Sequence, residues 1–232
     1  MNLFKKAAVF TDLHFGAKSN SLQHNQDCEN FISWFIETAK KENCETCFFL
    51  GDYNHHRASI NIHTLQFGLR SLERLSKAFD RVYFIPGNHD LYYRDKRDIH
   101  SVEWAKHLPN VEIINHFFTE GDVAIAPWLV QDDYKKLQKM EAKYLFGHLE
   151  LPRFYMNAMV EMPDHGDNAR GMMVLEWGQE PEFHSWPRQP LYRVYKLSDV
   201  LDNPEGLLLI DSYVRVQLDI DISYEEANFI RE

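Results

Sequence analysis

The chain has 232 residues, of which 44% are hydrophobic and 14% aromatic, and it carries a net charge of −10. This length and apolar content support one large domain, or a domain with a small appendage, and exclude wholesale disorder. No apolar run is long enough to span a membrane, and the acidic balance disfavours a free-standing nucleic-acid-binding module, which normally has a basic surface.

Short apolar runs alternate with helical stripes through the first half of the chain. The start, MNLFKKAAVFTDLHFG, reads as a first strand and not as a signal peptide, because no small-residue cleavage site follows the apolar run. The expected order is strand 7–12, helix 27–41, strand 46–52, helix 62–79, strand 81–90 and a weaker helix 99–107.

Strand character continues in the second half, with one interruption. The expected order is strands 111–118 and 122–128, a charged helix 132–140, strand 142–148, and then strands 171–177, 191–197, 206–211 and 212–221. Between 149 and 170 the chain has no sustained period, and its last residues, ISYEEANFIRE, look like the opening turns of a helix. Strands that alternate with helices indicate an α/β fold.

The three cysteines are Cys28, Cys44 and Cys47. A sparse, odd number of cysteines is typical of a reducing compartment, so we expect a cytoplasmic protein. Cys44 and Cys47 form a C-x-x-C pair, but no second pair completes a zinc site. Buried thiols are the favoured interpretation, and a redox pair is the alternative.

Polar residues follow the buried strands at the point where each strand ends. Because ligands bind at the carboxyl ends of strands in α/β sheets, four such clusters can converge on one place. They are Asp12-Leu13-His14, Gly51-Asp52, Gly87-Asn88-His89-Asp90 and Gly147-His148.

These clusters offer oxygen and nitrogen donors and no thiolate, which suits manganese, iron or zinc in a catalytic site. Two ions about 3.5–4 Å apart need a bridging carboxylate, and such pairs hydrolyse phosphoesters. Asp52, central among the clusters, is the expected bridge. The alternative is that these residues only cap strands and form turns.

The pattern DxH…GD…GNHD…GH, in this order, resembles the calcineurin-like metallophosphoesterase superfamily. The flanking segments FTDLHFGAKS, FFLGDYNHHRASINIHT, VYFIPGNHDLYY and FGHLELPRFYMN resemble SbcD- or Mre-type nucleases, and most of all the recombination endonuclease subunits of tailed phages. The match covers about the first 155 residues and resumes at 167–171. It implies a β-sandwich flanked by helices, in α/β/β/α layers.

The resemblance implies a role for each matching residue. Two divalent ions, manganese or alternatively magnesium, would be held by Asp12, His14, Asp52, Asn88 and His148. His89 would be the general acid or would stabilise the transition state, and Asp90 would orient it. His55 falls where the family has a residue that positions the DNA strand.

The resemblance also implies substrate and partners. The chain would be a DNA exonuclease and single-strand endonuclease subunit that acts with an SbcC-like ATPase, with a homodimer as a further option, in the host cytoplasm if a phage encodes it. Candidate DNA-binding residues are Arg57, Arg94, Lys96 and Arg97, beside Tyr92 and Tyr93. For the last three cations, a solvated charged loop with interspersed aspartates is the alternative.

The sequence departs from the family pattern after His148. The family has a further Gly-x-His-x-His, which would give one ligand to each metal, whereas here only His165 and His184 follow, and neither is in such a pair. An internal deletion near 165–168 is expected, and it would shorten the second sheet. Three explanations are open. The deletion is natural, or it is engineered, or the segment is present in the molecule and absent from this sequence. His165 is a candidate surrogate ligand, and a turn residue is its alternative.

We therefore expect a metallophosphoesterase domain at 1–211 and the start of a shortened capping domain at 212–232. Two alternatives to the nuclease remain open. One is a small-molecule phosphodiesterase that uses the same site. The other is a catalytically impaired fragment that binds metal weakly because the Gly-x-His-x-His motif is absent.

Overall fold

The computed structural model describes residues 2–149, 170–209, 212–223 and 225. The chain forms two compact units, one of Met1–Met162 with Arg170–Pro187 and the other of Pro163–Ala169 with Arg188–Glu232. The expected deletion near 165–168, His165 and most of the expected C-terminal helix lie outside the described residues. Along the described part of the chain, no helix combines the length and apolar character needed to cross a membrane.

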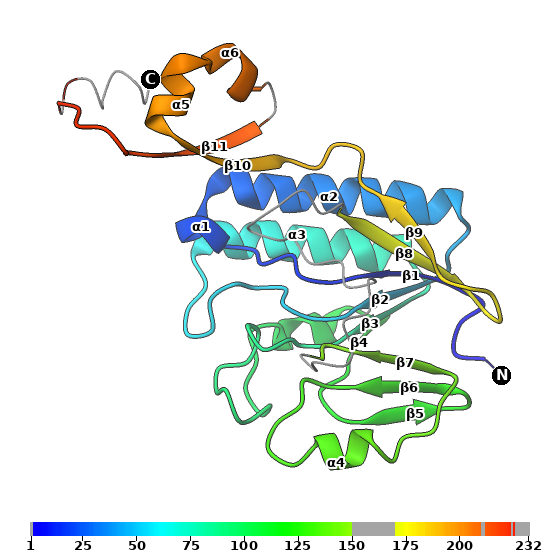
Figure 1. The fold of residues 1–232 in the computed structure, drawn as a ribbon. Coiled ribbons are helices and arrows are strands. Elements are labelled where there is room, and N and C mark those ends of the chain that lie inside the picture. Colours follow the sequence, from blue (N-terminus) through cyan, green and yellow to red (C-terminus); the bar gives the residue numbers. More distant parts are fainter. Residues whose placement is uncertain (1, 150–169, 210–211, 224, 226–232) are drawn as a thin grey trace. The chain divides into compact units, whose positions relative to one another are not determined.

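The first unit is built on a six-stranded sheet in the order β4-β3-β2-β1-β8-β9 (Figure 1). Four neighbouring strands are parallel, and β8 and β9 add to the β1 edge as antiparallel strands. Their bounds are β1 (Lys6–Phe10), β2 (Thr46–Phe49), β3 (Arg81–Phe84), β4 (Val111–Ile113), β8 (Gly171–Glu176) and β9 (Glu182–Ser185).

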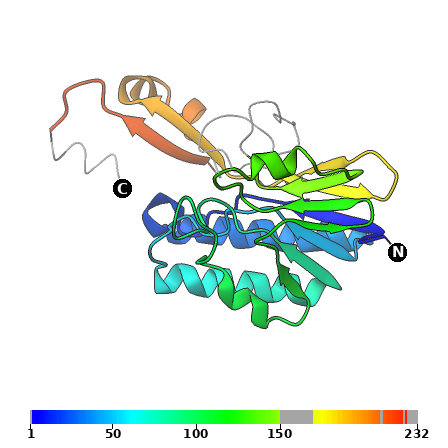
Figure 2. The same cartoon turned by 90° about the horizontal axis from the view of Figure 1, so that it is seen from below.

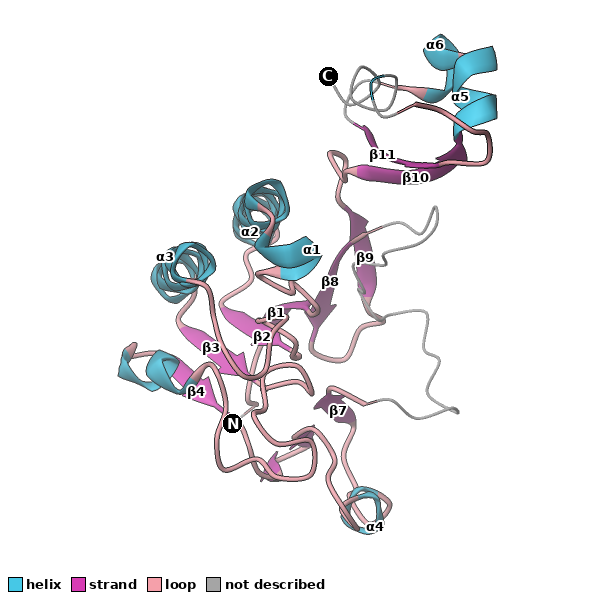
Figure 3. Cartoon of the chain, turned by 90° about the vertical axis from the view of Figure 1, so that its left-hand side faces the viewer, coloured by secondary structure: helices cyan, strands magenta, loops and turns pink. Residues whose placement is uncertain are grey.

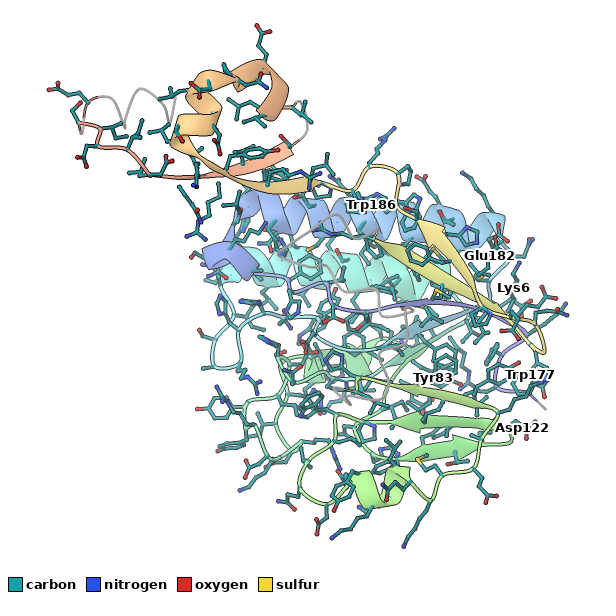
Figure 4. The ribbon with its side chains drawn as sticks, in the orientation of Figure 1. Lys6, Tyr83, Asp122, Trp177, Glu182 and Trp186 are labelled. Atoms are coloured by element: carbon teal, nitrogen blue, oxygen red, sulfur yellow. The ribbon has the colours of Figure 1, made fainter. Side chains whose placement is uncertain are left out.

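A second sheet of three strands has the order β5-β6-β7, with β5 (Phe118–Glu120), β6 (Val123–Ala126) and β7 (Tyr144–Gly147). It packs on one face of the six-stranded sheet through a core that includes Phe48, Tyr83 and Phe146. The rings of Phe48 and Phe146 stack with centroids 4.0 Å apart. The two sheets therefore form a sandwich, with Tyr83 between them (Figure 4).

Two long helices, α2 (Leu22–Lys41) and α3 (Ile62–Ala78), cover the opposite face of the large sheet (Figures 1 and 2). Their apolar stripes, with Phe31 and Phe35 on α2 and Leu72 and Leu75 on α3, are buried in its core. Trp186 closes this core beside α2, 5.5 Å from the ring of Phe31. The described helices elsewhere in the unit are short: α1 (Ala17–Asn20), η1 (Glu103–His107) and α4 (Tyr134–Leu137).

The expectation of an α/β fold with packed sheets flanked by helices is confirmed, but several elements differ. The single strand expected at 111–118 is two strands, because the chain leaves the large sheet after β4 and enters the small one at β5. The expected helix at 99–107 is the short 3₁₀ turn η1. The strand β9 was not expected.

The second unit contains β10 (Leu191–Lys196), α5 (Leu197–Asp202), α6 (Pro204–Leu207) and β11 (Ser212–Gln217). Figure 3 shows β10 and β11 side by side, and they pair in parallel. Over the described residues 206–209 the expected strand 206–211 is wrong, because Pro204 and the Asn203 side chain start α6 instead. The compact units divide near 187, and β10 and β11 pair within the second one. The domains expected at 1–211 and 212–232, with the start of a capping domain, remain a prediction.

The three cysteines are free and buried. Burial raises the pKa of the Cys44 thiol to about 11 and the pKa values of Cys28 and Cys47 as well. The thiols are therefore protonated at neutral pH, which favours the interpretation as buried apolar residues over a redox pair.

Candidate metal centre

The loops that follow β1, β2, β3 and β7 bring the five expected ligands together. Nε2 of His14 lies 3.4 Å from Oδ1 of Asp12 and 3.5 Å from Oδ2 of Asp52. The same oxygen of Asp52 lies 3.6 Å from Nε2 of His148. The Asp52 carboxylate thus lies between the two imidazoles, in the position that a bridging ligand requires.

Asn88 and His148 form the second half of this cluster. Nδ1 of His148 lies 2.9 Å from the carbonyl oxygen of Leu50, so it carries the ring proton and Nε2 presents its lone pair. The Asn88 amide oxygen is 3.0 Å from that Nε2, and the same amide position lies 3.0 and 3.1 Å from the two Asp52 oxygens.

Acceptor atoms of Asn88, His148 and Asp52 therefore face one another. Two arrangements satisfy them: the amide turns so that its nitrogen donates to the other two residues, or a cation lies among the acceptors. The atoms of Asp12, His14 and Asp52 that could bind a metal ion likewise lie within 4.8 Å of one another. The two groups fit divalent cations in residue type, in burial and in spacing.

The ligand loops have an unusual backbone. Asp12, His14 and Asp52 adopt left-handed conformations, with φ of 59°, 52° and 60°. Each costs about 1–2 kcal/mol for a residue other than glycine. The strain is held by hydrogen bonds that extend the β1–β2 pairing into the loops, from Asp12 N to Gly51 O and from His14 N to Asp52 O, both 2.9 Å.

Glycines allow the loops to approach closely. A Cβ atom at Gly87 would lie 2.2 Å from Oδ1 of Asp52, and one at Gly51 would lie 2.7 Å from Nδ1 of His148. Gly51 also has φ of 117°, which side chains other than hydrogen rarely allow. Both positions therefore require glycine if the carboxylate and the imidazole are to meet.

His14 and two further histidines, His55 and His89, lie next to one another beside the carboxylates. Nδ1 of His14 lies 3.3 Å from Nδ1 of His55, and the rings of His55 and His89 stack with centroids 5.2 Å apart. Burial lowers the pKa of His14, but the hydrogen bond to Asp12 and the charges of Asp52 and Asp12 outweigh this, so the pKa is raised. The predicted catalytic residues His89 and His55 thus adjoin the ligand set.

Asp90 has a different place from the one expected. Its carboxylate is fully buried and accepts hydrogen bonds from the backbone N–H groups of Tyr53, Asn54 and Gly87. Burial and the charge of Asp52 raise its pKa to about 6. The ring of His89 is instead held by the His55 carbonyl oxygen, 2.7 Å from Nδ1. Asp90 therefore fastens the loops after β2 and β3, and the hydrogen bonds of its carboxylate go to these loops and to Ser101 and not to the imidazole.

The four predicted DNA-binding cations fall into different environments. Arg94 and Lys96 are exposed, and the ammonium of Lys96 lies 5.4 Å from the ring centre of Tyr93. Arg57 is half-buried, and one of its guanidinium nitrogens is buried with no hydrogen-bond partner among the described residues. Arg97 differs from the expectation: it donates to the Trp128 carbonyl oxygen and to Asp133, so its charge is already compensated.

Two neighbours of the cluster were not foreseen. Trp128, after β6, packs on His148 with ring centres 5.5 Å apart. His24 and Asn25 of α2 bond to the loop that carries His14. Both α2 residues occupy the side of the helix that buries Cys28 and Phe31, and polar residues in such a stripe are a usable signal. His184 lies on β9 beside Glu182 and is not part of the ligand cluster.

The comparison with known proteins decides the family. Residues 5–184 match the family model described as calcineurin-like phosphoesterase. The chain belongs to the calcineurin-like phosphoesterase family. The metallophosphoesterase expectation is thereby confirmed, together with the expectation of a metal-dependent phosphoesterase that uses divalent ions. Which metal the chain uses is a separate question.

This calcineurin-like phosphoesterase is similar to a phage protein and, more distantly, to a nuclease of known structure. It is 27% identical over 153 residues to exonuclease subunit 1 of Enterobacteria phage T4, a match that covers 62% of this chain and 45% of that protein. The chain thus spans less than half the length of that relative. A crystal structure of the Pseudomonas putida nuclease MPE has 20% sequence identity and a TM-score of 0.35, with 52% of each chain covered.

Proposed function

We propose that the chain is a metal-dependent DNA nuclease that hydrolyses phosphodiester bonds at a pair of divalent ions, with manganese as the activating metal. One observation carries the proposal: a single oxygen of Asp52 lies 3.5 Å from His14 and 3.6 Å from His148. A carboxylate between two imidazoles suits a two-ion clamp on a phosphodiester. The similarity to a phage exonuclease subunit supports DNA as the substrate.

The ligand set divides into two groups that share Asp52. Asp12 and His14 would hold one ion with it, and Asn88 and His148 the other. Bound divalent ions polarise phosphoryl oxygens and activate water as a nucleophile. The Leu50 carbonyl and the Gly51 backbone keep the His148 lone pair directed at Asn88 and Asp52.

His89 is suited to move a proton. Its Nδ1–H donates to the His55 carbonyl oxygen, which leaves Nε2 as the atom that can take up or release a proton. In its protonated form the ring can give that proton to the departing oxygen of the cleaved strand. His55 holds the ring in place through its carbonyl and by stacking.

The 232 residues contain no Gly-x-His-x-His, so each ion would have three protein ligands, with water completing its coordination. We therefore expect two ions to bind, but weakly enough that a chelator removes them quickly. An SbcC-like ATPase is the proposed partner, since the T4 relative is named as a subunit. A partner with a basic surface would also offset the net charge of −10 during DNA binding.

The test is manganese-dependent cleavage of linear duplex and single-stranded DNA by the purified chain. Asp52→Asn should abolish cleavage and weaken manganese binding, because one substitution alters both halves of the site. Asp132→Asn is the matched control, since that aspartate is 77% exposed and pairs with Lys135 at the surface. Absence of DNA cleavage in manganese, with two ions bound, would contradict the nuclease assignment.

A small-molecule phosphodiesterase is the second candidate. The pairing of Arg97 with Asp133 favours it, because a cation expected to grip DNA is compensated within the chain. Turnover of a chromogenic phosphodiester with no turnover of DNA would select this function. If neither substrate is cleaved and no ions bind to the purified protein, the chain is a catalytically impaired fragment.

A further inference from the structure

The loop between β1 and α2, residues 11–21, includes the short α1, in which Lys18 and Ser19 are not helical, and it carries the first two candidate ligands in a strained backbone. Five of its residues other than glycine have positive φ, and Gly16 adds a sixth with φ of 92°. The five are Asp12, His14, Lys18, Ser19 and Asn20. Such a conformation persists only where the surrounding structure fixes it.

One face of α2 supplies three of the contacts that fix this loop. Nε2 of His24 lies 3.0 Å from the His14 carbonyl oxygen, and the Cys28 thiol donates to the Leu13 carbonyl oxygen at 3.0 Å. Between them, the Asn25 side-chain oxygen accepts from the Gly16 N–H at 2.8 Å. Cys28 follows His24 by four residues and Asn25 by three, the spacings at which side chains are neighbours on a helix surface. One side of α2 therefore bonds the loop backbone on both sides of His14.

Asn25 also joins the loop to α3. Its amide nitrogen donates to the Thr64 hydroxyl at 3.1 Å, and that hydroxyl donates to the Asn20 side-chain oxygen at 3.2 Å. Asn25 is completely buried and Thr64 is 1% exposed. The carboxamide therefore uses both of its ends, one on the loop backbone and one on the next helix.

The fit at this place is tight. A Cβ atom at Gly16 would lie 3.0 Å from the Asn20 side-chain oxygen and 3.1 Å from the Thr64 methyl group. A fully satisfied buried polar group specifies one arrangement, whereas an apolar side chain of the same size would fill the space without fixing the loop. Packing alone does not require an asparagine here.

We propose that Asn25 is a positioning residue for the first metal position. By holding Gly16 N–H and Thr64 together, it keeps the left-handed turn in which Asp12 and His14 face Asp52. This inference rests on the proposed metal site. It assigns to a residue outside that site the task of presenting two of its ligands, as partners beyond the ligands commonly do in metal centres.

The test compares Asn25→Leu with Asn110→Leu. Asn110 is a matched control, because its side-chain amide also bonds at both ends. Its nitrogen donates to the carbonyl oxygens of Ser76 and Phe79, and its oxygen accepts from the Ser76 hydroxyl. It lies just before β4, and none of these partners is a candidate ligand. Manganese affinity is measured by calorimetry on metal-free protein, and the apparent melting temperature is recorded for each variant.

We expect Asn25→Leu to weaken manganese binding by about tenfold to 100-fold, whereas Asn110→Leu lowers the melting temperature and leaves the affinity unchanged. In the DNA cleavage assay, Asn25→Leu should need more manganese for half-maximal rate and recover its rate at saturating manganese. Equal affinities of Asn25→Leu and the unsubstituted chain, or an equal loss in the control, would overturn the proposal.

Thr64 provides a second pair of variants if Asn25→Leu does not fold. Thr64→Val removes the hydroxyl at nearly constant volume and should weaken manganese binding, while Thr64→Ser keeps the hydroxyl and should restore it. Unchanged affinity in Thr64→Val would also overturn the proposal. If the unsubstituted chain binds no manganese, the proposed function fails; if it binds and the variants match it, only the role of Asn25 fails.

Discussion

At Gly87 the fold leaves no room for a side chain. A Cβ atom would lie 2.2 Å from Oδ1 of Asp52 and 2.4 Å from its backbone nitrogen, and the same Oδ1 accepts from His89 N–H at 2.8 Å. Gly87 does not have a positive φ, so the obstacle to alanine is steric and not conformational. Glycine is required here because the Asp52 carboxylate and backbone occupy the space that a side chain would need.

Gly87→Ala should therefore push the Asp52 carboxylate out of place and weaken manganese binding by about tenfold or more, as measured by calorimetry. Gly178→Ala is the control. Gly178 has φ of 85°, and no heavy atom lies within 4 Å of the position that a Cβ would take there. It should lose about 1 kcal/mol of stability through backbone strain and keep its affinity. Full manganese affinity in Gly87→Ala would contradict the argument.

His100 should make the protein sensitive to mild acid. Burial lowers the pKa of His100, as does the charge of Lys106, although Glu103 opposes both. The unfolded chain takes up a proton near pH 6.5, whereas the folded chain resists protonation at that pH, so the unfolded state binds more protons as the pH falls. The free energy of unfolding therefore decreases as the pH falls below 6.5 towards the lowered pKa.

The measurement is urea unfolding at pH 7 and pH 5 for the unsubstituted chain and for His100→Gln. The variant should lose less stability between the two pH values, because glutamine does not titrate. His107→Gln, on the exposed end of η1, is the matched control and should keep the original pH dependence. An identical pH dependence in all three proteins would rule out His100 as a source.

At the scale of elements, the loop 91–100 is fastened to the segment after β6. Arg97 donates to the Trp128 carbonyl oxygen at 2.9 Å and to Asp133, and Asp133 also accepts from Val130 N–H. Burial raises the pKa of Asp133, but the bonds from Arg97 and Val130 outweigh it, so the pKa is lowered. We therefore expect Arg97 to contribute to stability, where the sequence suggested a role in binding DNA.

Arg97→Ala should lower the free energy of unfolding at pH 7 by about 2–3 kcal/mol, because it leaves the mostly buried Asp133 carboxylate with Lys136 as its remaining cation. Arg94→Ala, at an exposed position on the same loop, should leave stability unchanged. Chemical denaturation of both variants tests this. If Arg97→Ala is as stable as the unsubstituted chain and only its KM for DNA rises, the pairing of Arg97 with Asp133 does not stabilise the fold.

The elements also show what the sequence can predict. Strand ends with ligand-type residues were predictable, since β1, β2, β3 and β7 are short apolar runs that stop at a polar cluster. The division of 111–118 between two sheets was not, because the apolar residues of β4 and β5 look alike and only tertiary packing assigns them. The pairing of Arg97 with Asp133 joins residues far apart in sequence, and no local pattern marks it.

Asn25 illustrates the same limit at the site. The stripe of Cys28, Phe31 and Phe35 continues back to His24 and Asn25, so the sequence marks two polar residues on a buried helix face. Their partners, the backbone at Gly16 and the hydroxyl of Thr64, are brought together by folding alone. The candidate ligands were therefore predictable from local pattern, and the contacts of the residue that we propose orients them were not.

At the scale of the whole molecule, the two compact units carry different features. The five candidate ligands all lie in the first unit. The second unit has large apolar side chains that are at least two-fifths exposed, namely Val194, Leu201, Leu208, Leu209, Leu218 and Ile220. The metal centre should thus depend on the first unit alone.

A chain ending at Pro187 should therefore bind manganese with the affinity of the full chain, within about twofold, because one unit supplies the whole ligand set. Calorimetry on both proteins, with circular dichroism to check folding, makes the comparison. A folded shortened chain that has lost manganese binding would show that the second unit contributes to the site.

The ligands come from the first strand of the chain and, at the other extreme, from the last strand of the small sheet. Divalent ions held among them would act as removable cross-links between segments that are synthesised at different times. A nascent chain cannot complete the pair until β7 has been synthesised and has docked. Metal uptake would then report that β7 has docked, and chelation would weaken the junction between the two sheets.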